Sequence, residues 1–457
     1  MDDLAIRGAT VIASGALQRD ILISGGRVTA LTEPGACTAR TEIDAAGLYA
    51  LPGIVDAHVH FNDPGRTEWE GWEHGSRGAA AGGTTTVIDM PLNSLPPVLD
   101  GASFDRKRAA GERGSIVDFA LWGGLTGTDP APLAELAARG AVGCKAFLCE
   151  SGVPEFAALG DAALVPAFAA AAASGLLVAV HAEDDALVAA ATARVRGAGD
   201  RDAQAWTASR PAQAEVRAVT RACDAARAAG ARLHVVHLSA AEALGAIGLA
   251  RDAGTDVSVE TCPHYLVFDE TDVAREGPLL KCAPPIRDSA NRELLWGALL
   301  GGRIDLVASD HSPCLAADKD RGREDIFAAW GGVSGAQSLL PALLTETRRR
   351  SEGLDLAAVL GFLAWRLSAK PAQRFGLWPR KGTIAVGSDA DVTLLDVDRV
   401  WKLDREALQT RSGRSPYTGR EFHGAVVRTI VRGVTVFGGG TFPAPPGHGR
   451  FVPAVPA

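Results

Sequence analysis

Five side chains of the types that bind divalent metals stand at the ends of apolar runs typical of buried strands. His58 and His60 end one such run, and side chains two apart on a strand share a face. Imidazole and carboxylate groups suit divalent ions such as zinc. We expect His58 and His60 to hold one ion, which Asp310 completes. His181 and His237 end two further runs, and we expect them to hold a second ion.

Lys145 interrupts the apolar run Val142–Leu148 and needs a separate explanation. An ammonium beside two divalent cations would be repelled by them. A neutral amine can instead add carbon dioxide and become a carbamate, an anion with two oxygen atoms. We expect such an N6-carboxylysine to bridge the two ions. The alternative is an unmodified Lys145 in a buried salt bridge with a strand-end carboxylate.

This set of ligands predicts a particular chemistry. Two ions that share one water lower its pKa toward about 7, and the resulting hydroxide can attack a carbonyl that the second ion polarises. Asp310 is expected to act as the catalytic residue, which takes up the proton and returns it to a leaving amide nitrogen. The sequence contains no Gly-x-Ser-x-Gly elbow and no P-loop that would favour another mechanism. We therefore expect metal-assisted hydrolysis of a C–N bond.

These residues need a scaffold that gathers strand ends, and the middle of the chain alternates apolar runs with helical patterns, among them 163–173, 212–229 and 241–253. Eight such units predict a parallel (β/α)8 TIM barrel of the α/β class, whose carboxyl strand ends meet at one mouth. A doubly wound open sheet is the alternative, although its Gly-x-Gly-x-x-Gly fingerprint is absent. The predicted strands are Ile54–His60, Thr84–Met90, Ile116–Trp122, Val142–Leu148, Leu176–His181, Arg232–Leu238, Asp256–Thr261 and Asp305–Asp310.

Both ends of the chain are rich in short β runs separated by glycine-containing turns. The runs are 4–7, 10–13, 20–23 and 27–30 near the N-terminus and 391–396, 425–431 and 434–437 near the C-terminus. This pattern predicts a smaller β-sandwich domain built from residues 1–52 and 383–457, beside a barrel domain of residues 53–382. Two unrelated terminal modules are the alternative.

The composition excludes several classes of protein. Of 457 residues, 47% are hydrophobic and 22% charged, which is typical of folded proteins. The 46 Lys and Arg against 54 Asp and Glu leave a net charge of −8, so no nucleic-acid partner is expected. The N-terminus resembles no signal peptide, and polar or helix-breaking residues interrupt the longest apolar stretch, so no membrane partner is expected. Seven cysteines without a Cys-x-x-Cys pair favour reduced thiols and a cytoplasmic location.

Several phrases resemble the amidohydrolase superfamily, in its cyclic-amidase branch of dihydroorotase, dihydropyrimidinase (hydantoinase) and allantoinase. The resemblance runs nearly end to end. It implies a barrel with two metal ions and a carboxylated lysine, and a homotetramer. Zinc is the default metal, while iron, cobalt and manganese also suit nitrogen and oxygen ligands. The phrases are Asp56–His60, His181–Glu183, Val235–Ser239, Glu260–Leu266, Ser309–Pro313 and Gly382–Asp391, together with Lys145.

Differences within the branch indicate the substrate. Dihydroorotases usually have an arginine where this chain has Asn62, to grip a substrate carboxylate, although Arg66 could substitute. Hydantoinases and dihydropyrimidinases have a tyrosine where this chain has Glu150. Four phrases resemble the allantoinases instead: Asn62–Gly71, Asp89–Ser94, Phe147–Phe156 and Ser415–Gly419.

The resemblance therefore implies that the ring amide of allantoin is opened to give allantoate, a step of purine and ureide catabolism. Hydantoinase, dihydropyrimidinase and dihydroorotase activities are the alternatives. A scaffold relative that has lost catalysis is a remote one, because every expected ligand position is filled.

The resemblance also implies substrate contacts at Asn62, Asn93, Ala283, Ser312 and His264. Ala283 would offer only its backbone, and Asn93 could instead stabilise its own turn. His264 could equally be structural, and His311, next to a ligand, could support that ligand. The remaining histidines are expected to be structural, with His234 facing away from the barrel mouth: His74, His234, His423 and His448.

Overall fold

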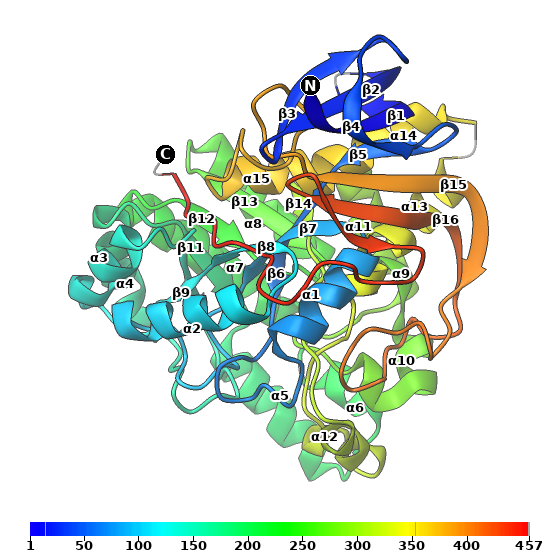
Figure 1. Cartoon of the computed structure of the whole chain (residues 1–457). Coiled ribbons are helices and arrows are strands. Elements are labelled where there is room, and N and C mark those ends of the chain that lie inside the picture. Colours follow the sequence, from blue (N-terminus) through cyan, green and yellow to red (C-terminus); the bar gives the residue numbers. More distant parts are fainter. Residues whose placement is uncertain (14, 352, 456–457) are drawn as a thin grey trace.

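The computed structural model describes residues 1–13, 15–351 and 353–455. Figure 1 shows strands surrounded by helices, with a second sheet beside them that combines the blue N-terminal and the orange-red C-terminal segments. The predicted fold class, a (β/α)8 barrel with a smaller β domain from both termini, is confirmed.

The barrel is a ring of parallel strands. β6 pairs with β7 and β7 with β8, while a second run follows the order β14-β13-β12-β11-β10-β9. Val59 forms a parallel bridge with His311, and the His60 amide donates to the His311 carbonyl at 2.8 Å, which joins the first strand to the segment that follows the last one. The strands are β6 (Ile54–Val59), β7 (Thr84–Asp89), β8 (Asp118–Leu121), β9 (Gly123–Gly124), β10 (Cys144–Phe147), β11 (Val178–His181), β12 (Leu233–Val235), β13 (Val257–Thr261) and β14 (Leu306–Val307).

Most barrel strands end earlier than the apolar runs predict. β12 ends at Val235 and β14 at Val307, and the chain then turns through His237 (φ 40°) and Asp310 (φ 44°). Residues other than glycine rarely adopt this left-handed backbone conformation, and those that do often lie at functional sites. Five non-glycine residues among those described have positive φ, namely Asn62, Asn93, His237, Asp310 and Arg432. Four of these five residues are predicted site residues, so the backbone leaves regular strand geometry near the predicted site.

Helices follow the barrel strands on the outside. The predicted helix 212–229 is α7 (Ala212–Ala229), which ends at Gly230 in the left-handed conformation that closes many helices. The predicted helix 241–253 is a 3-10 turn over Ala241–Ala243 followed by α8 (Leu244–Asp252). The other α-helices are α1 (Gly71–Ala81), α2 (Gly101–Gly114), α3 (Pro130–Ala138), α4 (Asp161–Ala173), α5 (Asp185–Gly197), α6 (Ala203–Ala208), α9 (Pro263–Val267), α10 (Glu270–Glu276), α11 (Ser289–Leu300), α12 (Ala316–Asp320), α13 (Leu339–Arg350), α14 (Leu356–Ala364) and α15 (Lys370–Arg374).

The two ends of the chain form one eight-stranded sheet of order β17-β16-β15-β5-β1-β2-β3, with β4 paired to β1. The predicted runs 4–7 and 10–13 are a single strand, β1, because an irregularity at Gly8 (φ 68°) shifts the register without breaking the pairing. The bounds are β1 (Asp2–Ile12), β2 (Ala16–Ser24), β3 (Arg27–Thr32), β4 (Ala39–Asp44), β5 (Tyr49–Pro52), β15 (Val392–Lys402), β16 (Glu421–Val431) and β17 (Val434–Gly438). Positions 14 and 456–457 of the predicted β domain and position 352 of the predicted barrel domain lie outside the described residues.

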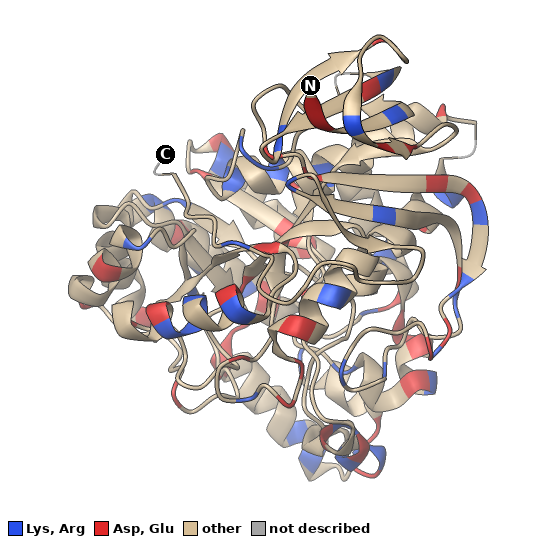
Figure 2. Cartoon of the chain, in the orientation of Figure 1, with Lys and Arg blue, Asp and Glu red and all other residues tan. Residues whose placement is uncertain are grey.

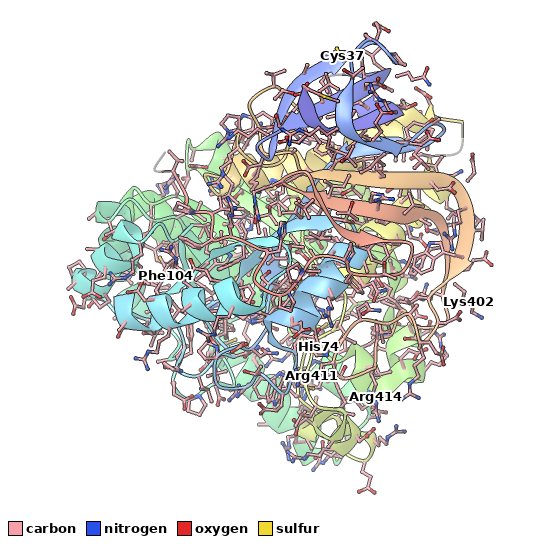
Figure 3. The ribbon with its side chains drawn as sticks, viewed as in Figure 1. Cys37, His74, Phe104, Lys402, Arg411 and Arg414 are labelled. Atoms are coloured by element: carbon pink, nitrogen blue, oxygen red, sulfur yellow. The ribbon has the colours of Figure 1, made fainter. Side chains whose placement is uncertain are left out.

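The surface carries both signs of charge. In Figure 2 positions of basic and acidic residues are interspersed along the outer helices and strands. All seven cysteines are free thiols, and the exposed one, Cys37, lies in the loop between β3 and β4 of the terminal sheet (Figure 3). Among the described residues, no helix combines the length and the apolar character that crossing a membrane requires.

Candidate active site

All six predicted metal ligands line one cavity of about 200 Å³ at the carboxyl ends of the barrel strands. Closure of the barrel brings together the first and the last predicted ligand, which are 252 positions apart in the chain (310 − 58). Each of these side chains is buried: His58, His60, Lys145, His181, His237 and Asp310.

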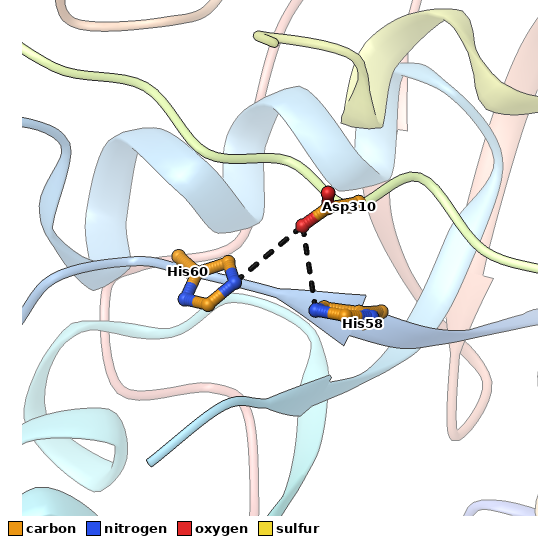
Figure 4. Close-up of side chains that lie close together, drawn as sticks. All are labelled: His58, His60 and Asp310. Atoms are coloured by element: carbon orange, nitrogen blue, oxygen red, sulfur yellow. Dashed lines mark ion pairs between the residues drawn. The ribbon is translucent and has the colours of Figure 1, made fainter. Parts of the chain in front are cut away.

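Three of the predicted ligands form a cluster that Figure 4 shows in close-up. The Nε2 atom of His58 lies 3.3 Å from Oδ1 of Asp310, and Nε2 of His60 lies 3.5 Å from the same oxygen. Two ligands of a tetrahedral zinc ion, each about 2.0–2.1 Å from the metal, stand roughly 3.3 Å apart. These spacings therefore fit a divalent ion between the three side chains.

The remaining two histidines form a second pair. Nδ1 of His181 faces Nε2 of His237 at 3.2 Å, which is again the separation expected of two ligands on one ion. Burial, together with the charge of Lys145, lowers the pKa of both imidazoles. Both rings are therefore neutral at pH 7, which is the form that binds metals.

Lys145 is 1% exposed on β10, with Nζ 5.2 Å from the centre of the Phe147 ring. Within the described part of the chain, its amine makes no hydrogen bond and no ion pair, so the alternative of a buried salt bridge finds no partner. Burial lowers the pKa of Lys145 to about 8 despite the nearby carboxylates. The neutral amine, which is the form that reacts with carbon dioxide, is thus accessible near neutral pH.

Two buried carboxylates for which the sequence predicts no role contact histidines that are predicted metal ligands. Glu260 at the end of β13 accepts from Nδ1 of His58 at 2.6 Å, and Glu183 accepts from Nε2 of His181 at 2.9 Å. Burial raises the pKa of each, but Arg210 beside Glu183 and the histidines beside Glu260 outweigh it and lower both pKa values to about 2. Both groups are therefore anions. Their positions inside His181–Glu183 and Glu260–Leu266, two phrases rich in polar residues, were the available signal.

The predicted substrate-side residues divide into two groups. Asn93, Ala283 and Ser312 line the cavity, and the Ser312 hydroxyl donates to Oδ1 of Asp310 at 3.0 Å. Asn62 is not among the lining residues, and its amide donates to the Pro313 carbonyl. His264 is also absent from the lining, although one of its ring nitrogens lies within 4.8 Å of the Asp310 carboxylate. Substrate contact by any of these residues stays a prediction.

Comparison with known proteins places this geometry in a family. A model described as the amidohydrolase family matches residues 49–436. The chain belongs to the amidohydrolase family. It is 47% identical over 438 residues to a Solibacter usitatus protein named allantoinase, with 96% of this chain and 94% of the relative covered. It is also 47% identical over 450 residues to a Rubrobacter xylanophilus protein named allantoinase, with 98% and 97% covered.

Solved structures agree with this membership. The amidohydrolase superimposes on the L-hydantoinase (dihydropyrimidinase) from Arthrobacter aurescens with a TM-score of 0.94 at 35% identity, over 99% of this chain and 100% of the other. A dihydropyrimidinase from Brevibacillus agri gives a TM-score of 0.92 at 31% identity, over 100% and 99%. This amidohydrolase is therefore a cyclic amide hydrolase.

Further cavity residues of this amidohydrolase were not predicted. The Lys281 ammonium donates to the Ala329 carbonyl at 2.6 Å and lies 4.2 Å from the centre of the Trp206 ring, which Arg210 also covers. Isolated lysines, arginines and tryptophans have no sequence spacing that distinguishes a cavity wall from a surface. The lining residues without a predicted role include Phe147, Trp206, Arg210, Lys281 and Trp330.

The histidines expected to be structural lie outside the cavity lining. His234 instead contacts Glu260 and Ser258 through its two ring nitrogens, at 3.1 and 2.7 Å. His311 lies 3.2 Å from Glu70 and accepts from the Gly335 amide. The other three histidines also have partners outside the cavity. His74 contacts Arg411, and both are labelled in Figure 3. His423 contacts Glu421, and His448 contacts Arg432.

Proposed function

We propose that this amidohydrolase hydrolyses a ring amide of allantoin, a hydantoin with a ureido arm, to give allantoate in purine and ureide catabolism. The observation that carries the proposal is the convergence of four histidines, Lys145 and Asp310 on one cavity at the barrel mouth. The relatives named allantoinase, which match over nearly the whole chain, support this substrate.

The ligand set favours two divalent ions, with zinc the first choice and iron, cobalt or manganese also compatible with nitrogen and oxygen donors. His58, His60 and Asp310 would hold one ion. His181 and His237 would hold the other, with carboxylated Lys145 shared between them. When bound, ions of this kind lower the pKa of a water molecule toward about 7 and polarise a carbonyl.

Asp310 moves the proton in this proposal. Its carboxylate takes a proton from the attacking water and returns it to the ring nitrogen that leaves. Burial raises the pKa of Asp310, but the facing histidines outweigh burial and hold it well below its usual range. The group therefore begins the reaction as a base, and the hydrogen bond from Ser312 fixes its orientation.

The substrate ring would lie between the ligand cluster and the opposite cavity wall. Asn93, Ala283 and Ser312 line that space and offer an amide, backbone groups and a hydroxyl to a ring with both donors and acceptors. Asn62 and His264 remain proposed contacts that would need a shift of the neighbouring loops, because neither lines the cavity here.

The remaining proposals concern the whole protein. Free, mostly buried thiols support a cytoplasmic location. We further propose a homotetramer and a division into a terminal β-sandwich domain (1–52 and 383–457) and a barrel domain (53–382). The pairing of β5 with β15 supports a shared terminal domain.

A hydantoinase activity is the second candidate. The solved L-hydantoinase shares 35% of the sequence and nearly the whole backbone, which favours a related ring amide as substrate. The position of its expected tyrosine is occupied by Glu150, which lines the cavity as an exposed carboxylate. A phenol donor is therefore absent at that position of this chain.

A substrate panel with metal analysis on the same sample tests the assignment. The purified full-length protein would be offered allantoin, hydantoin, dihydrouracil and dihydroorotate, and ring opening would be followed by loss of the substrate and appearance of the acid product. We expect the highest kcat/KM for allantoin and about two divalent ions per chain. Faster turnover of another ring would contradict the substrate, and a protein without metal would contradict the mechanism.

A further inference from the structure

Two ligand histidines differ in which ring nitrogen faces the cavity. His58 turns Nε2 toward Asp310, whereas His181 turns Nδ1 toward His237. The two nitrogens of a neutral imidazole are not equivalent, since one carries a hydrogen and the other a lone pair. A metal ligand must present the lone pair, so the two rings need opposite tautomers.

On the far side of the His58 ring, Nδ1 donates to Oε1 of Glu260 at 2.6 Å. The other oxygen of Glu260 is held by Nε2 of His234 at 3.1 Å, and the His234 ring is in turn fixed by the Ser258 hydroxyl at 2.7 Å. All four side chains are buried. The carboxylate therefore has a fixed position, and of the two nitrogens of the His58 ring it contacts only Nδ1.

The His181 ring has the same arrangement with its nitrogens exchanged. Here Nε2 donates to Oε2 of Glu183 at 2.9 Å, and Arg210 holds the same carboxylate oxygen at 2.5 Å. Arg210 also lines the cavity and stacks on Trp206, 4.6 Å from its ring centre. The guanidinium thus links the cavity wall to the orientation of a ligand ring.

We infer that Glu260 and Glu183 are positioning residues that fix opposite tautomers of His58 and His181, so that each ring presents its lone pair to the metal cavity. A carboxylate accepts hydrogen bonds and donates none, so each glutamate stabilises only the tautomer with the hydrogen on its own side. His234 and Arg210 hold the two carboxylates in place. The inference rests on the metal-dependent function proposed above and names residues that act through its ligands.

Four variants test the inference in the full-length protein: Glu260→Ala, Glu183→Ala and the corresponding Gln substitutions. Each would be loaded with zinc, and metal content and zinc affinity would be measured by dialysis against a chelator. We expect the Ala variants to bind at least one ion about 10- to 100-fold more weakly, the range found when such supporting carboxylates are removed. The Gln variants should recover much of this affinity, because the amide oxygen still accepts from the imidazole N–H.

Glu215 provides a matched control. It is buried like the two glutamates and pairs with Arg287 at 3.0 Å, but it accepts from the Ser239 and Ala240 amides and touches no ligand side chain. Glu215→Ala should therefore lower the melting temperature without a matching loss of zinc affinity.

Unchanged zinc affinity in Glu260→Ala and Glu183→Ala would overturn the inference, as would an equal loss of affinity in Glu215→Ala. Gln variants that bind as weakly as the Ala variants would also contradict it. A wild-type protein that holds no metal would contradict the proposed function instead, so the two failures are distinguishable.

Discussion

Burial sets the state of single side chains around the cavity. It lowers the pKa of Lys145, His181 and His237, and so favours the neutral amine and imidazoles that metal binding and carboxylation require. The carboxylates of the site remain charged because cations or imidazoles face them. One barrel mouth therefore contains neutral bases and anions, which together favour divalent cations.

Replacement of Lys145 tests the bridging role. Lys145→Ala should lower kcat by more than about 100-fold and reduce the bound metal, because the proposed shared anionic ligand would be lost. Short carboxylic acids added with zinc should restore part of the activity by taking the place of the carbamate. Lys402, an exposed lysine labelled in Figure 3, gives the control Lys402→Ala, which should keep full activity. Normal turnover in Lys145→Ala would refute the bridge.

Lys281 gives a prediction on pH and stability. Burial, with Lys319 and Arg210 nearby, lowers its pKa from 10.5 to about 7. Below pH 7 the amine is charged in the folded and unfolded chain, so the cost of burying the charge is fully present. Between pH 7 and about 10.5 the unfolded chain binds more protons, so folding stability gains from this group as the pH rises.

The melting temperatures of wild type and Lys281→Met, measured from pH 6.5 to 9, test this sign. The wild type should gain stability relative to the variant as the pH increases, whatever constant loss follows from the broken bonds to Ala329 and Phe327. Lys370→Met, at a lysine whose side chain is 31% exposed, serves as the control. A difference between wild type and Lys281→Met that does not change with pH would contradict the assignment.

At the scale of elements, strand ends and the short turns after them orient the predicted ligands. β10 carries Lys145 and begins directly after Gly143, where the chain passes close to its neighbours. A Cβ atom at Gly143 would lie 2.5 Å from the Leu177 carbonyl oxygen and 2.6 Å from the Trp122 ring. Neither a backbone carbonyl nor a buried indole can move away easily, so the position of β10 depends on this glycine.

Gly143→Ala should therefore destabilise the fold by about 1–3 kcal/mol, the usual cost of overpacking, and lower metal content by displacing Lys145. Chemical denaturation with metal analysis measures both effects. Gly245 in α8 has open space around it, so Gly245→Ala should be neutral or slightly stabilising. A Gly143→Ala protein with wild-type stability and metal content would show that β10 tolerates the shift.

At the scale of the whole molecule, a buried cluster of charges connects the barrel to the terminal sheet. The Lys381 ammonium contacts Asp118 of β8, Asp389 at 3.0 Å and Asp391 at 2.7 Å, next to β15. Arg432, after β16, also contacts Asp118. Burial raises the pKa of Asp391, so the lysine is needed to keep that carboxylate charged.

Lys381→Met should cost about 3–5 kcal/mol of unfolding free energy, because it leaves buried carboxylates without their cation. Thermal and denaturant unfolding measure the loss. Lys370→Met, which removes a partly exposed partner 3.7 Å from Asp305, should cost less than about 1 kcal/mol. Equal small losses in both variants would show that Arg432 alone neutralises the cluster.

Much of the fold and of the ligand set could be predicted because each depends on local pattern. Each of the eight apolar runs contains a barrel strand, and among the described barrel strands only the two-residue β9 (Gly123–Gly124) lies outside them. That His58 and His60 share a face follows from strand geometry. Strand ends were less predictable, since left-handed backbone at His237 and Asp310 has no signature in apolar periodicity. Glu183 and Glu260 were missed because their significance lies in a contact with another strand or ring.

The amino-acid sequence by itself determined the residue types, their strand-end spacing and the resemblance that indicates a cyclic amide hydrolase. Only the tertiary structure decided which nitrogen of each histidine faces the cavity, which predicted substrate residues line it, and how its carboxylates are held. The physical reason is that a buried polar group forms its hydrogen bonds with the groups that surround it in the folded structure. In a closed barrel those neighbours come from positions as distant as His58 and Glu260, which no local pattern relates.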